Sequence, residues 1–226
     1  ELVKLMQTKQ IRFKTVPSLD QLATGKVISQ LREVDIGDLL GREAVKLDFN
    51  DIRKYLEHRV VMVTGAGGSI GQELCRQIAK FQPLRLLLVE KSEYALFQIE
   101  QDMTELGFKD LIEPLIADIL DTQRMEYIFS KFSPSVVFHA AAHKHVPMME
   151  DYPVESVQVN VLGTKILADL AVKYKVERFV MVSTDKAVNP TNVMGASKRI
   201  AEIYVQSLYR KLHATMNGST TKFITT

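Results

Sequence analysis

Residues 60–71 read VVMVTGAGGSIG, an apolar run that leads directly into a turn rich in glycine. The β-branched run at residues 60–64 predicts a buried strand, and the amphipathic stretch at residues 69–81 predicts a helix. A glycine-rich turn in this position lets backbone N–H groups approach a pyrophosphate, and the helix N-terminus adds unpaired donors. The stretch therefore predicts a dinucleotide-binding α/β domain.

The same alternation of apolar runs and amphipathic stretches continues along the chain. Further strands are predicted at residues 85–89, 113–117, 136–141, 178–183 and from 222, and helices at 92–106, 121–132, 154–174 and 193–213. Each parallel crossover needs a helix, so apolar strands that alternate with helices indicate a parallel sheet covered on both faces. We predict a doubly wound, Rossmann-type domain over residues 59–226. Because the last strand begins only at Lys222, we expect it to be C-terminally incomplete, ending before a substrate-binding lobe.

Residues 1–58 lack a sustained period and are broken by proline and glycine. We interpret them as an N-terminal arm with short helices at residues 18–24, 35–40 and 50–57. Such an arm packs on the main domain or on another subunit, and a solvated linker is the alternative.

Composition narrows the class of protein. The 226 residues are 46% hydrophobic and 25% charged, which argues against a disordered chain, and the formal net charge of +2 gives no reason to expect nucleic acid. The single cysteine, Cys75, excludes an internal disulfide, fits a reducing compartment and reads as a buried small hydrophobe. No apolar run approaches the ~20 residues of a membrane helix. These features favour a cytoplasmic protein.

The four glycines of the turn have predicted roles in building the cofactor site. Gly65 allows the tight turn, Gly67 and Gly68 allow close approach of the phosphates, and Gly71 lets the helix lie near the sheet. Glu90 ends the second strand, where a carboxylate accepts hydrogen bonds from the adenosine ribose and repels a 2′-phosphate. We therefore predict NAD rather than NADP, although Lys91 could soften that repulsion.

The remaining cofactor residues follow from the strand ends. Asp118 and Ile119 follow the third strand, where an adenine ring would rest, and a capping role for Asp118 or Asp121 is an equal alternative. The small side chains of residues 140–142 would lie beside the cofactor. The full predicted set is Gly65, Gly67, Gly68, Ser69, Ile70, Gly71, Glu90, Lys91, Ser92, Asp118, Ile119, Ala140, Ala141, Ala142 and Lys198.

Three histidines after the fourth strand, His139, His143 and His145, have the spacing H-x₃-H-x-H. No carboxylate stands at ligand spacing, so we predict no metal site. We instead expect the edge of the sheet to face a substrate there, through Lys144, His145, Val146 and Pro147. Asn160 contacts the substrate or satisfies backbone groups, and the two roles stay open.

The stretch from Ser183 to Lys198 carries the candidate chemistry. In short-chain dehydrogenases, Tyr-x-x-x-Lys places a phenol and a lysine on one helical face, where the lysine lowers the pKa of the phenol. Lys198 fits the lysine, which would hold the nicotinamide ribose, but Met194 stands in place of the tyrosine and cannot ionise. A plain alcohol dehydrogenase mechanism is therefore excluded.

These residues carry a family resemblance. The matching stretches are residues 63–71 (VTGAGGSIG), 138–150 (FHAAAHKHVPMME), 160–164 (NVLGT), 182–190 (VSTDKAVNP) and 193–199 (VMGASKR). The chain resembles the membrane-associated group of nucleotide-sugar 4,6-dehydratases, extended short-chain dehydrogenase/reductases of capsule, O-antigen and protein-glycan biosynthesis. The arm, with residues 16–19 and 31–41 (LREVDIGDLLG), resembles the linker ahead of the domain in that group.

The resemblance implies conversion of UDP-N-acetylglucosamine to its 4-keto-6-deoxy product with NAD. A neutral Lys186 would remove the C5 proton, and a protonated Asp185 would donate to the departing C6 hydroxyl. Thr184 would contact the 4-hydroxyl, whose proton goes to Asp185 or a water relay, and Met194 would shape the pocket. The alternative for Asp185 and Lys186 is a surface ion pair in a loop.

The resemblance also implies a homo-oligomer, formed through the helices at residues 154–174 and 193–213. It further implies that membrane segments outside this chain anchor the protein at the inner face of the cell membrane. Two other functions stay open. A C4 epimerase or reductase would use the same dinucleotide site, and a non-catalytic regulatory domain would bind the cofactor without turnover.

Overall fold

The computed structural model describes residues 14–15, 32–33, 49–215 and 221–226. The chain divides into two units, residues 1–48 and 49–226. In the first unit, β1 (Lys14–Thr15) pairs antiparallel with β2 (Arg32–Glu33). The helices predicted at residues 18–24 and 35–40 lie outside the described residues. The helix predicted at residues 50–57 is present as α4 (Phe49–Leu56) and belongs to the second unit.

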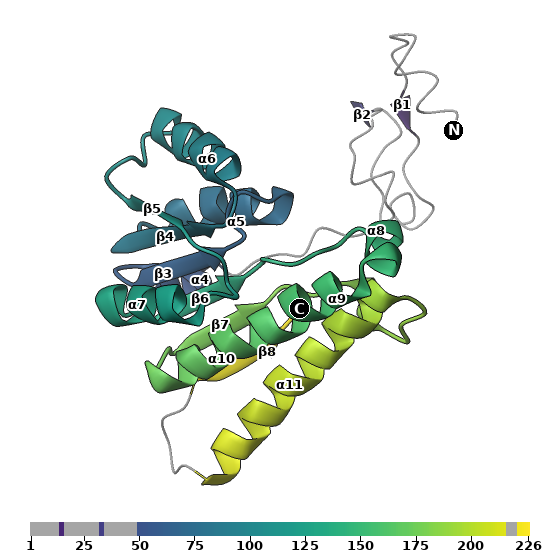
Figure 1. Ribbon diagram of the computed structural model, residues 1–226. Helices are drawn as coiled ribbons and strands as arrows, with labels where there is room; N and C mark the ends of the chain where they lie inside the picture. The colour runs from purple at the N-terminus through teal and green to yellow at the C-terminus, as the bar shows by residue number, and fades with distance from the viewer. Residues whose placement is uncertain (1–13, 16–31, 34–48, 216–220) are drawn as a thin grey trace, which may run out of the picture. The chain divides into compact units, whose positions relative to one another are not determined.

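The second unit is built on one parallel sheet (Figure 1). Its strands are β3 (Val60–Thr64), β4 (Arg85–Glu90), β5 (Ile112–Ile116), β6 (Val136–His139), β7 (Arg178–Met181) and β8 (Lys222–Thr225). Their order is β5-β4-β3-β6-β7-β8, and every neighbouring pair is parallel. The order reverses between β3 and β6, which confirms the predicted doubly wound α/β fold.

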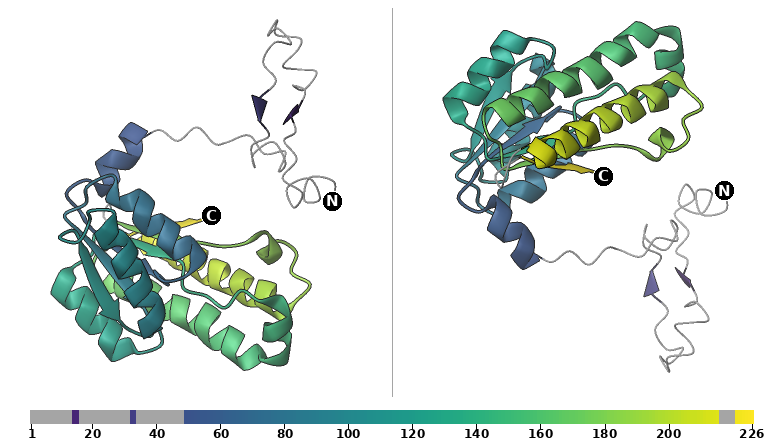
Figure 2. Two further views of the ribbon diagram at one scale, coloured as in Figure 1. Left: turned by 90° about the horizontal axis from the view of Figure 1, so that it is seen from above. Right: turned by 90° about the horizontal axis from the view of Figure 1, so that it is seen from below.

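Helices cover both faces of this sheet (Figures 1 and 2). One face is covered by α4, α5 (Ser69–Ala79) and α6 (Glu93–Glu105), the other by α7 (Thr122–Phe132), α10 (Thr164–Lys173) and α11 (Val193–Thr215). The strand period of two divides the core accordingly. Val61 and Val63 pack toward α5, whereas Met62 packs toward α7 and α10, and all three are fully buried. Cys75 is likewise buried in the first layer, where burial raises the pKa of its thiol to about 12.

The region between β6 and β7 differs from the prediction of one helix at residues 154–174. A short helix, α8 (Val146–Asp151), comes first, and it was not predicted. Then α9 (Pro153–Ser156), a π-helical segment (Val157–Gly163) and α10 follow without a break. A π segment widens the helix locally and is common at functional sites. Here it carries Asn160 at its centre.

Two strands are shorter than predicted. The strands expected at residues 136–141 and 178–183 end at His139 and Met181. A 3₁₀ turn (Asp185–Ala187) then follows β7 and leads to α11. The residues beyond the two strand ends form loops at the carboxyl edge of the sheet, where ligands bind in this fold.

The glycine turn is held tightly against the end of β6. Gly65 has a φ of +69°, and a Cβ built there would lie 2.7 Å from the Ala141 Cα. A Cβ on Gly71 would lie 1.9 Å from the Gly65 carbonyl oxygen, closer than any real contact. Both positions therefore require glycine. Because neither position carries a side chain, α5 can begin directly at the edge of the sheet.

We expect the substitution Gly71→Ala to lower the free energy of unfolding by about 3 kcal/mol, because the new methyl group displaces turn backbone rather than a flexible side chain. Urea denaturation measures the change. Gly68→Ala is the matched control, since its Cβ would have as its nearest neighbour the Gly65 oxygen at 3.3 Å. Equal denaturation midpoints for the two variants would contradict this packing.

Candidate functional site

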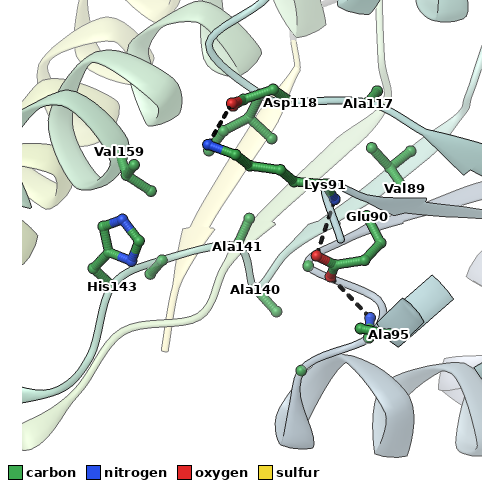
Figure 3. Close-up of a pocket in the computed structure, with 15 residues that line it drawn as sticks. Val89, Glu90, Lys91, Ala95, Ala117, Asp118, Ala140, Ala141, His143 and Val159 are labelled. Carbon is green, nitrogen blue, oxygen red and sulfur yellow. Dashed lines mark hydrogen bonds and ion pairs between the residues drawn. The ribbon is translucent and has the colours of Figure 1, made fainter. Parts of the chain in front are cut away.

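A cavity of about 330 Å³ opens at the carboxyl edge of the sheet, beside the glycine turn (Figure 3). Ten residues of the predicted cofactor set line it: Gly65, Gly67, Gly68, Glu90, Lys91, Asp118, Ile119, Ala140, Ala141 and Ala142. Sequence reasoning missed five others: Val89, Ala95, Ala117, His143 and Val159. Val89 and Ala117 are neighbours of predicted residues at strand ends, so the strand pattern could have found them. The other three reach the cavity from α6, from the loop after β6 and from the π segment.

Glu90 ties the glycine turn to the end of β4. Its carboxylate accepts backbone N–H groups from Gly67 at 3.0 Å, Lys91 at 2.9 Å and Ser92 at 3.0 Å. Figure 3 shows the carboxylate pointing from β4 toward the turn. An acceptor-only group is thus fixed in the cavity wall, next to the backbone that would approach a phosphate.

Lys91 and Asp118 form an ion pair at this cavity, with 2.8 Å between Nζ and Oδ2 (Figure 3). The Asp118 Oδ1 also accepts the Leu120 N–H at 3.0 Å. Burial opposes ionisation of Asp118, but the hydrogen bonds from Lys91 and Leu120 prevail and lower its pKa. The capping role belongs instead to Asp121, whose Oδ1 accepts the Arg124 N–H at 2.9 Å at the start of α7.

The other predicted cofactor residues on α5 and α6 lie outside the cavity lining. Ser69 accepts a hydrogen bond from the Lys144 ammonium at 3.2 Å, which places that cation at the N-terminus of α5. Ile70 is 54% exposed. Ser92 caps α6 by accepting the Ala95 N–H at 3.3 Å. Of the predicted substrate residues, His145 precedes α8, and Val146 and Pro147 form its first turn.

A buried histidine lies beneath the cavity. His139 is fully buried, with Nδ1 2.8 Å from the Thr64 hydroxyl and Nε2 2.9 Å from the Thr164 hydroxyl. Thr164 donates its own proton to the Asn160 carbonyl at 2.7 Å, so it must accept from Nε2–H. Nδ1 then accepts from Thr64. Burial, with a smaller effect of the Lys198 charge, lowers the His139 pKa to about 3, so the ring is neutral. Both nitrogens are occupied, which removes His139 from any metal site.

Asn160 joins the loop after β6 to α11. Its Oδ1 accepts the His143 N–H at 2.8 Å, and its Nδ2 donates to the His143 carbonyl at 3.0 Å and the Ser197 hydroxyl at 2.9 Å. Asn160 is only 1% exposed. Of its two open roles, the structure places it in the satisfaction of backbone groups, and a contact with substrate stays a prediction.

The candidate acid and base lie on the surface as an ion pair. Asp185 and Lys186 are 83% and 49% exposed, and the Lys186 Nζ is 3.2 Å from the Asp185 Oδ1. That oxygen also accepts the Thr184 hydroxyl at 2.9 Å. Hydrogen bonds from Thr184 and Lys186 lower the pKa of Asp185, so it is ionised. Water and these donors stabilise the carboxylate in the free protein, and donation by a protonated Asp185 to the departing C6 hydroxyl stays a prediction.

Lys198 and Met194 share one buried face of α11, at 5% and 2% exposure. The Lys198 ammonium donates to the Val182 carbonyl at 2.9 Å, just past β7. Burial lowers the pKa of Lys198 to about 8, against the opposing charge of Glu202. A Cβ on Gly195 would lie 2.2 Å from the Lys186 carbonyl oxygen, so the helix packs directly on the 3₁₀ turn. The five predicted catalytic residues share the carboxyl edge but do not line the cavity.

Two observations concern metals and membranes. Among the described residues, no group of three or more His, Cys, Asp or Glu side chains has the arrangement of a metal site. Within the same residues, every helix is too short or too polar to span a bilayer.

Comparison with known proteins places this site in context. The sequence model of a family described as "Polysaccharide biosynthesis protein" matches residues 61–226. The capsular polysaccharide biosynthesis protein CapD of Staphylococcus aureus is 43% identical over 210 residues, which are 92% of this chain and 35% of CapD. The probable polysaccharide biosynthesis protein EpsC of Bacillus subtilis is 44% identical over 88% of this chain and 33% of its own length. The chain thus spans about a third of these curated relatives.

Two further relatives are named for reactions on nucleotide sugars. A UDP-N-acetylglucosamine 4,6-dehydratase (inverting) of Campylobacter jejuni is 29% identical over 61% of this chain and 40% of its own length. A UDP-glucose 4-epimerase of Rickettsia canadensis is 33% identical over 64% of this chain and 42% of its own length.

Solved structures agree on the fold. Pen from Bacillus thuringiensis superimposes with a TM-score of 0.67 at 29% identity, over 76% of this chain and 52% of its own. The Bordetella bronchiseptica enzyme WbmG, solved in complex with NAD, has a TM-score of 0.61 at 18% identity, over 75% of this chain and 52% of its own. At that identity WbmG supports the fold alone.

We expect the imidazole of His139 to remain a neutral Nε2–H tautomer between pH 8 and pH 5. Its pKa is lower in the folded state than the ordinary 6.5, so it contributes stability above pH 6.5 that is lost as the pH falls toward 3. Long-range ¹H–¹⁵N NMR of the imidazole reports the tautomer directly. A ring that gains its second proton near pH 6.5 would contradict the buried network.

We expect Asn160→Ala to lower the free energy of unfolding by about 3 kcal/mol, because it leaves the His143 backbone and the Ser197 hydroxyl without their partner. Urea denaturation measures the loss. Gln158→Ala, an exposed position on the same π segment, is the control and should cost less than about 0.5 kcal/mol. Similar losses in both variants would show that the Asn160 bonds contribute nothing specific.

Proposed function

The chain belongs to the polysaccharide biosynthesis protein family, and on that premise we propose that it carries the active site of a nucleotide-sugar 4,6-dehydratase. The proposed substrate is UDP-N-acetylglucosamine, and the proposed cofactor is NAD. One observation carries the choice of reaction. The edge of the sheet presents a linked hydroxyl, carboxylate and amine in Thr184, Asp185 and Lys186, while Met194 replaces the phenol of an alcohol dehydrogenase.

The cavity residues fit a dinucleotide. The turn at Gly65 and Gly67 has no room for side chains, since Cβ atoms there would meet Ala141 and Ala95 within 2.7 Å. At these two positions no side chain keeps a phosphate away from the backbone. Glu90 would accept the adenosine ribose hydroxyls, and Lys198 would hold the nicotinamide ribose. NAD, when bound, supplies a reversible acceptor for the hydrogen that leaves C4 and returns at C6.

The contact between Thr184 and Asp185 supports a route for the proton of the 4-hydroxyl. Thr184 accepts that proton while it passes its own proton to Asp185, which is 2.9 Å away and ionised in the free protein. Asp185 becomes protonated by this step rather than beforehand. It can then donate to the C6 hydroxyl, which leaves as water.

Lys186 removes the C5 proton in this proposal, and for that its amine must be neutral. The 4-keto group acidifies the C5 proton, and a substrate that covers Lys186 removes the water that stabilises its ammonium form. Lys186 returns a proton to C5 at the end. The proton that its ammonium form gives to solvent as substrate binds is regained as product leaves, so the balance is one water lost, with every protein group restored.

A second candidate is a nucleotide-sugar C4 epimerase. The similarity to the Rickettsia epimerase favours it, and the dinucleotide cavity serves either reaction. An epimerase reaction at C4 does not need a base at C5, so this candidate gives Lys186 no such role. Retention of hydrogen at C5 therefore separates the two candidates.

We also propose that the protein self-associates through α9, the π segment and α11. These elements expose large apolar side chains, namely Val154, Val157, Leu162, Ile200 and Ile203. Exposed apolar surface of this kind marks interaction sites. Anchoring of the whole protein to a membrane stays a prediction.

The test uses the protein at its natural length with NAD⁺ and UDP-N-acetylglucosamine in deuterated water, followed by NMR. We expect a 4-keto-6-deoxy product that carries deuterium at C5, formed without added reductant. Lys186→Ala should lower the rate by at least about 10²-fold, because a positioned base contributes that much. Lys109→Ala, an exposed position in the turn after α6, should leave it unchanged.

Two results would contradict the proposal. A C4 epimer with protium retained at C5 would establish the epimerase. Unchanged sugar in the presence of bound NAD⁺ would favour a regulatory domain or a different nucleotide sugar.

A further inference from the structure

The mouth of the cavity is more acidic than the chain as a whole. Glu90, Lys91 and Asp118 line it, and Glu155 lies near enough to raise the pKa of Lys91 through its charge. The charges of Asp118 and Glu155 thus both act on the Lys91 ammonium, while the Glu90 carboxylate is held by the glycine turn. His143 also lines the cavity and acts on Asp118 electrostatically.

Lys91 is the cation closest in sequence to Glu90, at the position where a ribose 2′-phosphate would need one. By itself it would weaken the selection against NADP that Glu90 provides. In the structure, however, its Nζ is 2.8 Å from Asp118, on the neighbouring strand end. Asp118 is in turn fixed by the Leu120 N–H at 3.0 Å, so it presents its second oxygen to Lys91.

We propose that Asp118 is a specificity-determining residue that engages Lys91 and thereby keeps the site selective for NAD over NADP. This inference rests on the proposed dinucleotide site. The ion pair holds the Lys91 ammonium at Asp118 and away from Glu90, whose carboxylate would then repel a 2′-phosphate. Selectivity for NAD then depends on two carboxylates. Glu90 repels the 2′-phosphate, and Asp118 pairs with the Lys91 ammonium.

The alternative arrangement is unfavourable for a physical reason. Were Lys91 to turn to a 2′-phosphate, Asp118 would lose its cation while its side chain is only 30% exposed. Two carboxylates and a phosphate would then share one ammonium group at a partly buried site, where like charges are poorly screened. The dianionic phosphate therefore gains less from Lys91 than it would from a lysine without a partner.

Isothermal titration calorimetry of the protein at its natural length with NAD⁺ and with NADP⁺ tests the proposal through a double-mutant cycle. The proteins are wild type, Asp118→Asn, Lys91→Met and the double variant. Asparagine keeps an oxygen for the Leu120 N–H while it removes the charge. Asp118→Ser, whose hydroxyl can also accept that N–H, is the second variant if the first fails to fold.

We expect wild type to prefer NAD⁺, and Asp118→Asn to bind NADP⁺ about tenfold more tightly with a smaller change for NAD⁺. Lys91→Met should have little effect on NADP⁺ while Asp118 is present. In the Asp118→Asn background it should remove the whole gain. The gain should also shrink as ionic strength rises.

Three results would overturn the inference: wild type that binds NADP⁺ as well as NAD⁺, an Asp118→Asn variant without a gain, or a gain that survives Lys91→Met. The last would mean that Asp118 acts only by long-range repulsion. Failure of the proposed function looks different. A chain that binds neither dinucleotide refutes the site itself and this inference with it, whereas NAD⁺ binding without sugar dehydration refutes only the reaction.

Discussion

The reversal of strand order between β3 and β6 is the constraint from which the site follows. The two strands are neighbours, but the chain leaves them toward opposite faces of the sheet, so their loops diverge and leave a cavity. The glycine turn can enter this narrow space only without side chains, as the 2.7 Å approach of a Gly65 Cβ to Ala141 shows. Glu90 then fixes the turn through the Gly67 N–H. The backbone donors and the carboxylate are therefore organised before any ligand binds, which lowers the entropy lost on binding.

A network of buried polar side chains stabilises the carboxyl edge of the sheet. It runs from Thr64 through His139 and Thr164 to Asn160, and from there to Ser197 on α11. In the part of the chain that the structure describes, every buried side-chain nitrogen or oxygen has a hydrogen-bond partner. A fully satisfied network specifies one arrangement, because any shift would leave a buried group unpaired. The wall of the cavity at His143 and the helix that carries Lys198 are thus held by the same carboxamide.

The sequence predicted what depends on local pattern and missed what depends on distant partners. Apolar runs, the glycine turn and the residues at strand ends predicted the fold and ten lining residues, because each of these signals lies in consecutive positions of the sequence. The π segment was predicted as ordinary helix because its apolar period is similar. The hydrogen bonds that Asn160 makes from its centre reach residues 17 and 37 positions away and have no local signal. The pairing of Lys91 with Asp118 spans two strand ends and has no local signal. The ionised state of Asp185 in the free protein could not be predicted from the sequence either, because it depends on exposure and hydrogen bonds that only the fold determines.

The placement of Asp185 and Lys186 gives a physical reason why the proposed acid and base stay inactive in water. Their backbone is fixed, since the Lys186 carbonyl packs against Gly195 at the start of α11, yet their side chains are solvated. In the free protein the two side chains form an ion pair, with Nζ 3.2 Å from Oδ1. In the proposed reaction, Asp185 loses its charge when Thr184 passes it a proton, and the covering substrate removes the water but not the backbone support, so the pair can separate into acid and base without a rearrangement of the turn. In the proposed reaction, basicity at Lys186 is therefore coupled to the presence of substrate, and the C5 proton is attacked only when a sugar lies over the 3₁₀ turn.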